Sequence, residues 1–318
     1  MIELRPLRQF VAVAEELHFG RAAQRLHMTQ PALTQAIQQL ERKLGALLLQ
    51  RSQRRVALAP AGAALLPELR RLIAAADALP AQAQAAAAGR AGRLRLGFVS
   101  SIAYGPLPGW LRGFRQAQPG VQLALREATL DVQLDAFAAD QIDAGFVLHA
   151  EGAVPPGLRA IRVQSEPLVL ALPELHPLAA RKRPAWAALS AEPLVIFPRR
   201  IAPSLYDAVL GHYRAQGATP VIAQEAIQMQ TIVNLVSAGI GIAWVPASLT
   251  LLQRPGVVYR PTPGAALRCE TSLVWTAAAP PVVESFVAHV AAAVDAAERR
   301  QSARQPAPPT APADRRKT

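Results

Sequence analysis

The chain has 318 residues, of which 51% are hydrophobic and 18% charged, and its formal net charge is +12 at pH 7. This length is enough for two or three domains, each with its own core. Residues 1–60 hold nine Lys/Arg against four Asp/Glu, whereas residues 91–298 hold sixteen against fifteen. The excess positive charge therefore lies at the ends of the chain, and its middle is not a general binder of polyanions.

Several protein classes are disfavoured by what the sequence lacks. The single cysteine, Cys269, excludes an internal disulfide and suits a reducing compartment. The first residues form a charged helical pattern rather than a signal peptide, and no run of about 18 apolar residues could span a membrane. We therefore expect a cytoplasmic protein without a membrane partner.

The segment from Phe19 to Leu44 predicts two helices on either side of a break at residues 27–29. Thr29 can cap the second helix, and Pro31 is tolerated in its first turn. A helix, a tight turn and a second helix with a polar outer face are typical of a helix-turn-helix. The spacing alone equally allows an ordinary helix pair in a bundle. The inner face of the second helix is one apolar stripe: Leu33, Ile37, Leu40 and Leu44.

The outer face of that second helix carries mostly uncharged donors and acceptors, which suit base edges in a major groove. Two apolar runs, residues 47–49 and 56–58, follow on either side of a basic turn and predict a β-hairpin wing. Arginines in such a wing suit phosphates, which position a protein without reading sequence. The predicted DNA contacts are Thr29, Gln30, Pro31, Thr34, Gln35, Gln38, Arg51, Arg54 and Arg55.

A long helix should begin near Pro60 and end before the break at residues 89–92. Its apolar residues recur at alternating intervals of four and three residues. This heptad pattern predicts a seam that packs against a partner helix. The alternative is a single helix that packs on its own domain. Pro67 and Pro80 lie inside the pattern, and Pro80 predicts a bend or an early end. The seam consists of Leu65, Leu69, Leu72, Ala76, Leu79, Ala83 and Ala86.

From Arg93 onward, strand and helix patterns alternate, which predicts an α/β fold with a mainly parallel sheet covered on both faces. The residues from 301 to 318 are rich in proline and alanine, and we expect them to be disordered. Predicted strands are 94–99, 121–126, 143–148, 168–172, 194–197, 221–224, 240–245 and 271–275. Predicted helices are 106–118, 131–139, 203–216, 228–238 and 282–299.

No enzyme site is recognisable in the sequence. The six histidines show no metal-ligand spacing, and no phosphate-binding loop or G-x-S-x-G elbow occurs, so we expect no cofactor and no metal. Ligand binding is more plausible, because open α/β sheets bind ligands beyond the carboxyl ends of their strands. Ser101 could equally be only a helix cap, and the arginine pair 199–200 only solvated surface. The candidate ligand contacts are Ser100, Ser101, Thr129, Leu148, Pro198, Arg199, Arg200 and Pro246.

Residues 1–66 resemble the DNA-binding domain of the LysR-type transcriptional regulators. The matching text is LRQFVAVAEELHFGRAAQRLHMTQPALTQAIQQLERKLGALLLQR, followed by VALAPAGAALLP. The resemblance implies a winged helix-turn-helix domain (1–59), a linker and dimerisation helix (60–90), and an effector-binding domain (91–300) like a type 2 periplasmic binding protein. Its subdomain I would hold residues 91–164 and 268–300, its subdomain II would hold 165–267, and the chain would cross near Gln164 and Arg268.

The effector half also resembles the branch of this family that controls the degradation of aromatic compounds such as muconate and benzoate. The carrying text is LGFVSS at 96–101, QIDAGF at 141–146, IFPR at 196–199 and GIGIAWVPAS at 239–248. The resemblance implies that Ser101 contacts the effector. Thr129 lies one residue away from the position at which the branch has a matching threonine. Leu148 stands where the branch has an effector-binding arginine, and Gln35 where an arginine is common.

Leu148 leaves two readings of the effector. Either Arg199 or Arg200 replaces the missing arginine, or the effector is less anionic than muconate, which we favour. As a whole, the sequence predicts a transcriptional regulator that responds to an aromatic or carboxylate effector. Its implied partners are double-stranded DNA, a second copy of itself in a homodimer or homotetramer, and RNA polymerase. The alternative is a small-molecule-binding protein or enzyme whose helical N-terminal domain serves assembly only.

Overall fold

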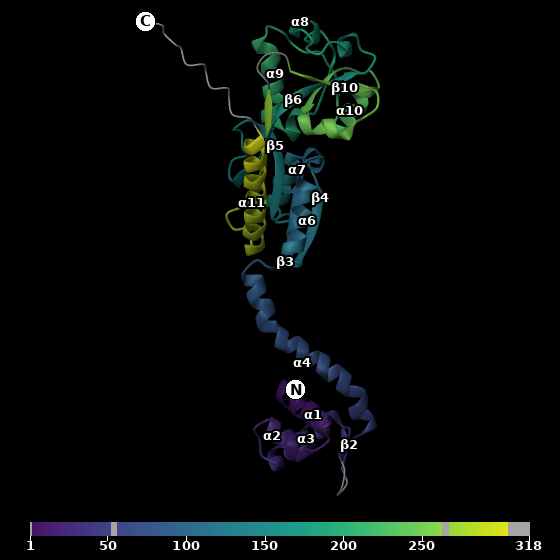
Figure 1. Ribbon diagram of the computed structural model, residues 1–318, viewed down its shortest axis with the longest axis vertical. Coiled ribbons are helices and arrows are strands. Elements are labelled where there is room, and N and C mark those ends of the chain that lie inside the picture. Colours follow the sequence, from purple (N-terminus) through teal and green to yellow (C-terminus); the bar gives the residue numbers. More distant parts are fainter. Residues whose placement is uncertain (1, 52–55, 263–266, 305–318) are drawn as a thin grey trace, which may run out of the picture. The chain divides into compact units, whose positions relative to one another are not determined.

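The computed structural model describes residues 2–51, 56–262 and 267–304, without the side chains of residue 51 and residues 301–304 (Figure 1). The chain divides into two compact units, residues 1–84 and 85–318. Within the described part, no helix is long and apolar enough to cross a membrane.

The first unit contains the predicted helix-turn-helix and wing. The side chains of Phe10, Leu33 and Ile37 are fully buried in its core, so the apolar stripe of the second helix lies where its periodicity predicts. Two short strands then pair in antiparallel register, with Leu49 opposite Leu58. The elements are α1 (Leu4–Glu16), α2 (Phe19–Arg25), α3 (Gln30–Leu44), β1 (Leu49–Arg51) and β2 (Val56–Leu58).

The start of α3 differs from the prediction in one detail. Thr29 occupies the N-cap position with an extended backbone, but its side chain makes no capping hydrogen bond. A cap can accept from either of two N–H groups in the first turn. Because Pro31 lies in that turn and has no N–H, one of these two donors is missing. In contrast, the side chain of His18 caps α2 by accepting from the N–H of Arg21 at 3.2 Å.

The long helix α4 (Pro60–Ala87) runs through both Pro67 and Pro80, so of the two outcomes expected at Pro80, a bend or an early end, the early end does not occur. Its ribbon bends along its length (Figure 1). Each proline removes one helical hydrogen bond, but the second half of the helix is rich in alanine, the strongest helix former. Leu69 of the predicted seam packs into the core of its own unit, whereas Leu72 and Leu79 are 50% and 61% exposed.

Seven strands of the second unit form one sheet in the order β10-β6-β11-β5-β3-β4, and β9 also pairs with β6. A separate pair, β7 (Leu194–Ile196) and β8 (Ile222–Glu225), is parallel. The seven strands are β3 (Ala91–Phe98), β4 (Gly120–Glu127), β5 (Ala144–Ala150), β6 (Arg159–Pro173), β9 (Ala243–Pro246), β10 (Val257–Pro261) and β11 (Arg268–Trp275).

The expectation of a mainly parallel sheet is wrong. In the seven-stranded sheet, β3 is parallel to β4 and to β5, but β6 and β11 are antiparallel to all of their partners. The reason is that β6 and β11 run beside each other in opposite directions, which no strand–helix–strand unit could produce. The predicted strand at 168–172 is only the second half of β6, and β10 has no counterpart among the predicted strands.

The strand β6 belongs to both halves of the second unit. It pairs with β11 as far as Pro167 and with β9 from Leu168 onward, close to the expected crossing at Gln164. At this point the Glu166 carboxylate accepts hydrogen bonds from the N–H and the hydroxyl of Ser248, at 2.6 and 3.0 Å. Burial raises the pKa of this carboxyl above its ordinary value. These hydrogen bonds thus hold β6, where it crosses between the two halves, to the segment that follows β9.

Two large hydrophobic cores lie on either side of the crossing. One contains Phe114 of α6 and Phe286 of α11, which meet edge to face with centroids 5.0 Å apart. The other contains Tyr213 and Trp244, whose indole N–H donates to the tyrosine hydroxyl at 3.1 Å. The helices are α5 (Ser100–Ala103), α6 (Leu107–Ala117), α7 (Leu130–Ala138), α8 (Trp186–Leu189), α9 (Pro203–Ala215), α10 (Met229–Ser237) and α11 (Pro281–Arg304). Three short 3₁₀ helices are η1 (Pro177–Ala180), η2 (Arg199–Ile201) and η3 (Ala247–Leu252).

The end of α11 bears on the predicted disordered tail. The helix continues to Arg304, so residues 301–304 are helical, and the expectation of disorder from residue 301 is wrong for these four residues. Residues 305–318 lie outside the described residues. Good helix formers, namely glutamine, alanine and arginine, continue past the expected end of the sensor domain at residue 300, which explains the extension.

Candidate nucleic-acid interface and ligand cavity

The exposed face of α3 carries mainly uncharged polar side chains, with the charged Arg42 and Lys43 near its carboxyl end. Gln30, Gln35 and Gln38 are exposed on this face, together with Pro31 in its first turn. Thr34 is partly exposed, and its hydroxyl donates to the carbonyl of Gln30 at 2.9 Å. The Thr34 proton is therefore engaged, which leaves its methyl group and an acceptor lone pair for a ligand. A face of this kind can hydrogen-bond base edges in a major groove.

Glu41 is a structural residue of this domain that the sequence analysis missed. Its side chain is buried, and its Oε1 accepts the backbone N–H groups of Leu48 and Leu49 at 2.9 and 3.1 Å. The carboxylate thus ties the end of α3 to the start of the wing. A signal was present, because Glu41 follows Ile37 by four residues and so falls on the apolar stripe, where a charge needs a buried partner.

The three predicted wing arginines can be followed only in part. Arg51 lies at the end of β1, but its side chain is outside the described residues, as are Arg54 and Arg55 entirely. Their phosphate contacts remain predictions.

Ion pairs hold the helices of the first unit together. The Glu15 carboxylate of α1 accepts from Arg25 of α2 and from Arg70 of α4, both at 2.9 Å. Burial opposes ionisation of Glu15, but the two arginines outweigh it and hold the pKa of this carboxyl below its ordinary value. The arginines lie half-exposed, so the pairs fix orientation more than they add stability.

A small, partly open cavity of about 40 Å³ lies in the second unit, at the carboxyl ends of β3 and β5. It brings together four of the predicted ligand contacts, Ser100, Ser101, Thr129 and Leu148. Ser101 is only 3% exposed, and its hydroxyl oxygen has no hydrogen-bond partner within the described part of the chain. A buried hydroxyl without a partner is costly in the empty protein and is available to a ligand. The other lining residues are Val99, Ala128, Phe197, Ile201, Ala202, Ile227, Gln228 and Met229.

The remaining predicted contacts are not among the residues that line this cavity. Pro246 is buried at the end of β9. Arg199 is exposed and forms a bidentate pair with Asp207, at 2.8 and 2.7 Å, which lowers the pKa of the Asp207 carboxyl. Arg200 is also exposed and lies 3.7 Å from the carboxylate of Asp131. As the structure stands, both arginines are paired on the surface, and Pro198 next to them is not among the residues that line this cavity.

The cavity residues that the sequence analysis missed are mostly apolar. Phe197 and Ile201 come from the segment after β7, and Met229 begins α10. An apolar residue gives no sign in the sequence that it faces a ligand rather than the core. Gln228 could have been predicted as a ligand contact. It precedes a helix whose first turn has no acidic residue, so the partial positive charge of the helix start is left for an anion.

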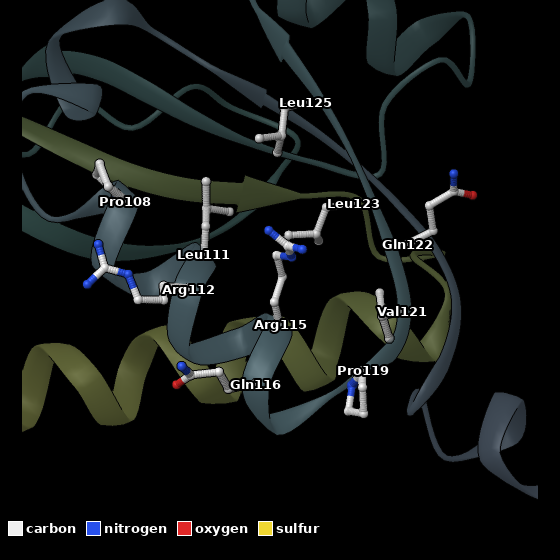
Figure 2. A pocket seen from close by; sticks show the side chains of 10 residues that line it. All are labelled: Pro108, Leu111, Arg112, Arg115, Gln116, Pro119, Val121, Gln122, Leu123 and Leu125. Carbon is white, nitrogen blue, oxygen red and sulfur yellow. The ribbon is translucent and has the colours of Figure 1, made fainter.

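A wider hollow of about 890 Å³ lies between α6 and β4, the edge strand of the sheet. Figure 2 shows Leu111, Leu123 and Leu125 beside this hollow, with Arg112 and Arg115 reaching from α6. It collects none of the predicted ligand contacts. Its shape is that of a surface groove along an unpaired strand edge, so we do not place the effector in it.

Two family models match the sequence. The model described as "LysR substrate binding domain" matches residues 87–295, and the model described as "Bacterial regulatory helix-turn-helix protein, lysR family" matches residues 4–63. The chain belongs to the LysR family. It is a LysR-type DNA-binding transcriptional regulator that responds to a small-molecule effector, and this family is one of regulators rather than of enzymes.

Individual relatives support this assignment. The chain is 46% identical over 275 residues to the HTH-type transcriptional regulator IlvR of Caulobacter vibrioides, across 86% of this chain and 92% of that protein. It is 40% identical over 263 residues to the regulator AlsR of Bacillus subtilis, across 81% and 85%. A solved structure of full-length CbnR complexed with its target DNA matches with a TM-score of 0.75 and 31% identity, over 92% of this chain and 100% of that one. These relatives do not assign this LysR-type regulator to the aromatic-degradation branch.

Proposed function

We propose that this LysR-type regulator reads its operator with the polar face of α3 and senses an aromatic or carboxylate effector in the cavity beside Ser101. The observation that carries the proposal is the pairing of two features in one chain. A surface of exposed glutamines lies on the second helix of a helix-turn-helix, and a buried hydroxyl with no partner among the described residues lines a separate small cavity. The first suits base edges and the second suits a small ligand.

Substituting Gln35 should test the reading role directly. We expect Gln35→Ala and Thr34→Ala each to weaken binding to the operator by about 1–3 kcal/mol, because each removes contacts to base edges. Arg54→Ala should instead weaken binding to all DNA, because a phosphate contact carries no sequence information. Fluorescence anisotropy with operator and scrambled DNA would measure both. Equal losses on the two DNAs for Gln35→Ala would show that Gln35 contacts the backbone, and the reading role would be wrong.

We further propose that the protein is a homodimer through α4 and a tetramer built from two dimers. Support for the dimer comes from Leu72 and Leu79, apolar residues of the heptad pattern that the described residues of the chain leave 50% and 61% exposed. A tetramer needs a second kind of contact between subunits. The exposed edge of β4 is a candidate for this contact, because an unpaired strand edge readily pairs with another chain. Because such a regulator acts on DNA, we place it in the cytoplasm with RNA polymerase as its partner.

Footprinting would decide between regulation and the alternative, in which the helical domain serves assembly only. The full-length protein should protect a two-part site upstream of a divergently transcribed neighbouring gene, with its halves one DNA turn or a multiple apart. Effector should change the protection pattern in one half. Binding that is uniform along the fragment, or that vanishes at moderate salt on every sequence, would support the alternative.

A further inference from the structure

We propose that the effector is a short-chain aliphatic monocarboxylate, whose carboxylate binds the hydroxyl of Ser101 and the start of α10. The inference rests on the proposed sensing role of the cavity and narrows its ligand class. Three independent properties of the cavity lead to it: its size, the absence of a cation among its lining residues, and the donors at one end.

The size of the cavity limits the hydrocarbon part of the ligand. A site needs roughly 10–15 Å³ of such volume to hold one water molecule, so about 40 Å³ is room for a few non-hydrogen atoms. Phe197 and Leu148 in its lining are almost fully buried, and protein interiors yield little without loss of packing. A propionate-sized molecule needs only a small expansion, whereas an aromatic ring needs the cavity to open widely.

The lining is apolar and uncharged apart from a few neutral polar groups at one end. Each described residue that lines the cavity is uncharged. Leu148 is one of the lining residues, and an arginine at such a place would be needed to pair a second carboxylate. Burying an unpaired carboxylate against such a wall is strongly unfavourable. The lining therefore disfavours a dicarboxylate.

The start of α10, however, offers hydrogen-bond donors for one carboxylate. The first three N–H groups of α10, those of Met229, Gln230 and Thr231, have no acceptor among the described residues, and Gln228 at the N-cap makes no side-chain cap. The start of a helix carries a partial positive charge that favours an anion. At α7 the equivalent site already has an acid in its first turn, Asp131, whereas α10 has none.

The hydroxyl of Ser101 is the second, independent sign of a ligand at this end. It is buried, it lines the same cavity as Gln228 and Met229, and none of the described residues is its hydrogen-bond partner. A carboxylate held between this hydroxyl and the α10 N–H groups would satisfy all of them. Its short chain would then lie against Leu148, Phe197 and Ile201.

Four matched probes test the class by calorimetry on the full-length protein. Propionate should bind with an affinity on the order of 0.1–1 mM, since a ligand of few atoms can bury little surface. Propionamide removes the charge, succinate adds a second carboxylate and benzoate adds a ring, and each should bind at least about tenfold more weakly. If propionamide, succinate or benzoate bound as tightly as propionate or more tightly, the proposed class would be wrong.

Two variants connect the binding to these residues. Ser101→Ala should weaken propionate about tenfold or more, because a hydrogen bond to a charged group is lost. Ser190→Ala, which removes a surface hydroxyl bonded to the carbonyl of Ala187, should change nothing. Leu148→Arg should reverse the preference and favour succinate. Propionate binding that is unchanged in Ser101→Ala, or a Leu148→Arg protein that still rejects succinate, would overturn the assigned geometry.

Failure of this inference and failure of the proposed function give different results. If operator binding in the footprint responds to benzoate or muconate but not to propionate, the protein senses an effector of another class and only the inference fails. If no small acid binds and the protein does not protect DNA, the proposed function fails with it.

Discussion

Replacing Leu72 with aspartate should convert the assembled protein into monomers and abolish specific operator binding. Leu72 is half exposed on α4, and Leu79 lies two turns further along the same face. In a symmetric dimer each substitution acts twice. It removes roughly 1.5–3 kcal/mol of apolar burial per leucine and places two like charges in the seam. Two half-sites that are bound by separate monomers lose the gain of linked binding, on the order of a hundredfold.

Analytical ultracentrifugation at micromolar concentration would measure the mass of the Leu72→Asp protein, and anisotropy its operator affinity. The matched control is Ala74→Asp, which adds the same charge at an exposed position off the seam of the same helix. The control should keep the mass and the affinity of the wild type. A Leu72→Asp protein with unchanged mass would contradict the seam, and the dimer contact would have to be sought elsewhere, for example along β4.

The helices of the DNA-binding domain could be predicted almost to the residue because their signals are local. In α3, the apolar stripe, the proline in the first turn and the glycine at the C-cap are all within one stretch of the chain. The seam of α4 was predicted less well, since periodicity alone does not say which partner an apolar stripe meets. Leu69 meets the core of its own chain and Leu72 does not, a difference set by where α4 leaves the domain.

Strand pairing was much harder to predict, because it depends on residues far apart in the chain. The alternation of strands and helices correctly indicated an α/β fold, but it suggested parallel neighbours throughout. The pairing of β6 with β11 joins Arg159 to Trp275 and Pro167 to Arg268, contacts that no local pattern encodes. The polar residues of β6, such as Gln164 and Glu166, also hid its first half, because they serve the crossing rather than a hydrophobic face.

For the candidate ligand site, the rule that ligands lie beyond the carboxyl ends of strands led to the region where the small cavity lies and to part of its lining. Ser101 and Leu148 follow from that rule, since they lie at the ends of β3 and β5. Arg199 satisfied the same rule but lies on the surface, because Asp207, eight residues later in α9, offers it a bidentate partner. Where a cation points is decided by such a partner, and the sequence alone does not rank the possible partners.

Adding one methyl group at Gly62 should destabilise the DNA-binding domain by about 3 kcal/mol or more. A Cβ at this position in the first turn of α4 would lie 2.1 Å from the carbonyl oxygen of Leu48. This carbonyl cannot easily move, because it accepts from the N–H of Ala59 at 2.9 Å while the N–H of Leu48 donates to Glu41. The side chain of Leu48 is also fully buried. The whole junction between wing and linker would have to shift.

The arrangement of tryptophans allows the effect of Gly62→Ala to be assigned to one unit. All four tryptophans, at positions 110, 186, 244 and 275, lie in the second unit, so their fluorescence follows the sensor while far-UV circular dichroism follows both units. Urea unfolding of Gly62→Ala should show an early dichroism transition that fluorescence does not share, together with loss of operator binding. The control is Gly109→Ala in α6, where a Cβ meets no atom within 4 Å. It should leave the first unit unchanged and stabilise the sensor by roughly 0.5–1 kcal/mol. If the dichroism and fluorescence of Gly62→Ala instead changed together, at the urea concentration of the wild type, the junction would have relaxed around the methyl group. The close approach of α4 to Leu48 would then not be required for the fold.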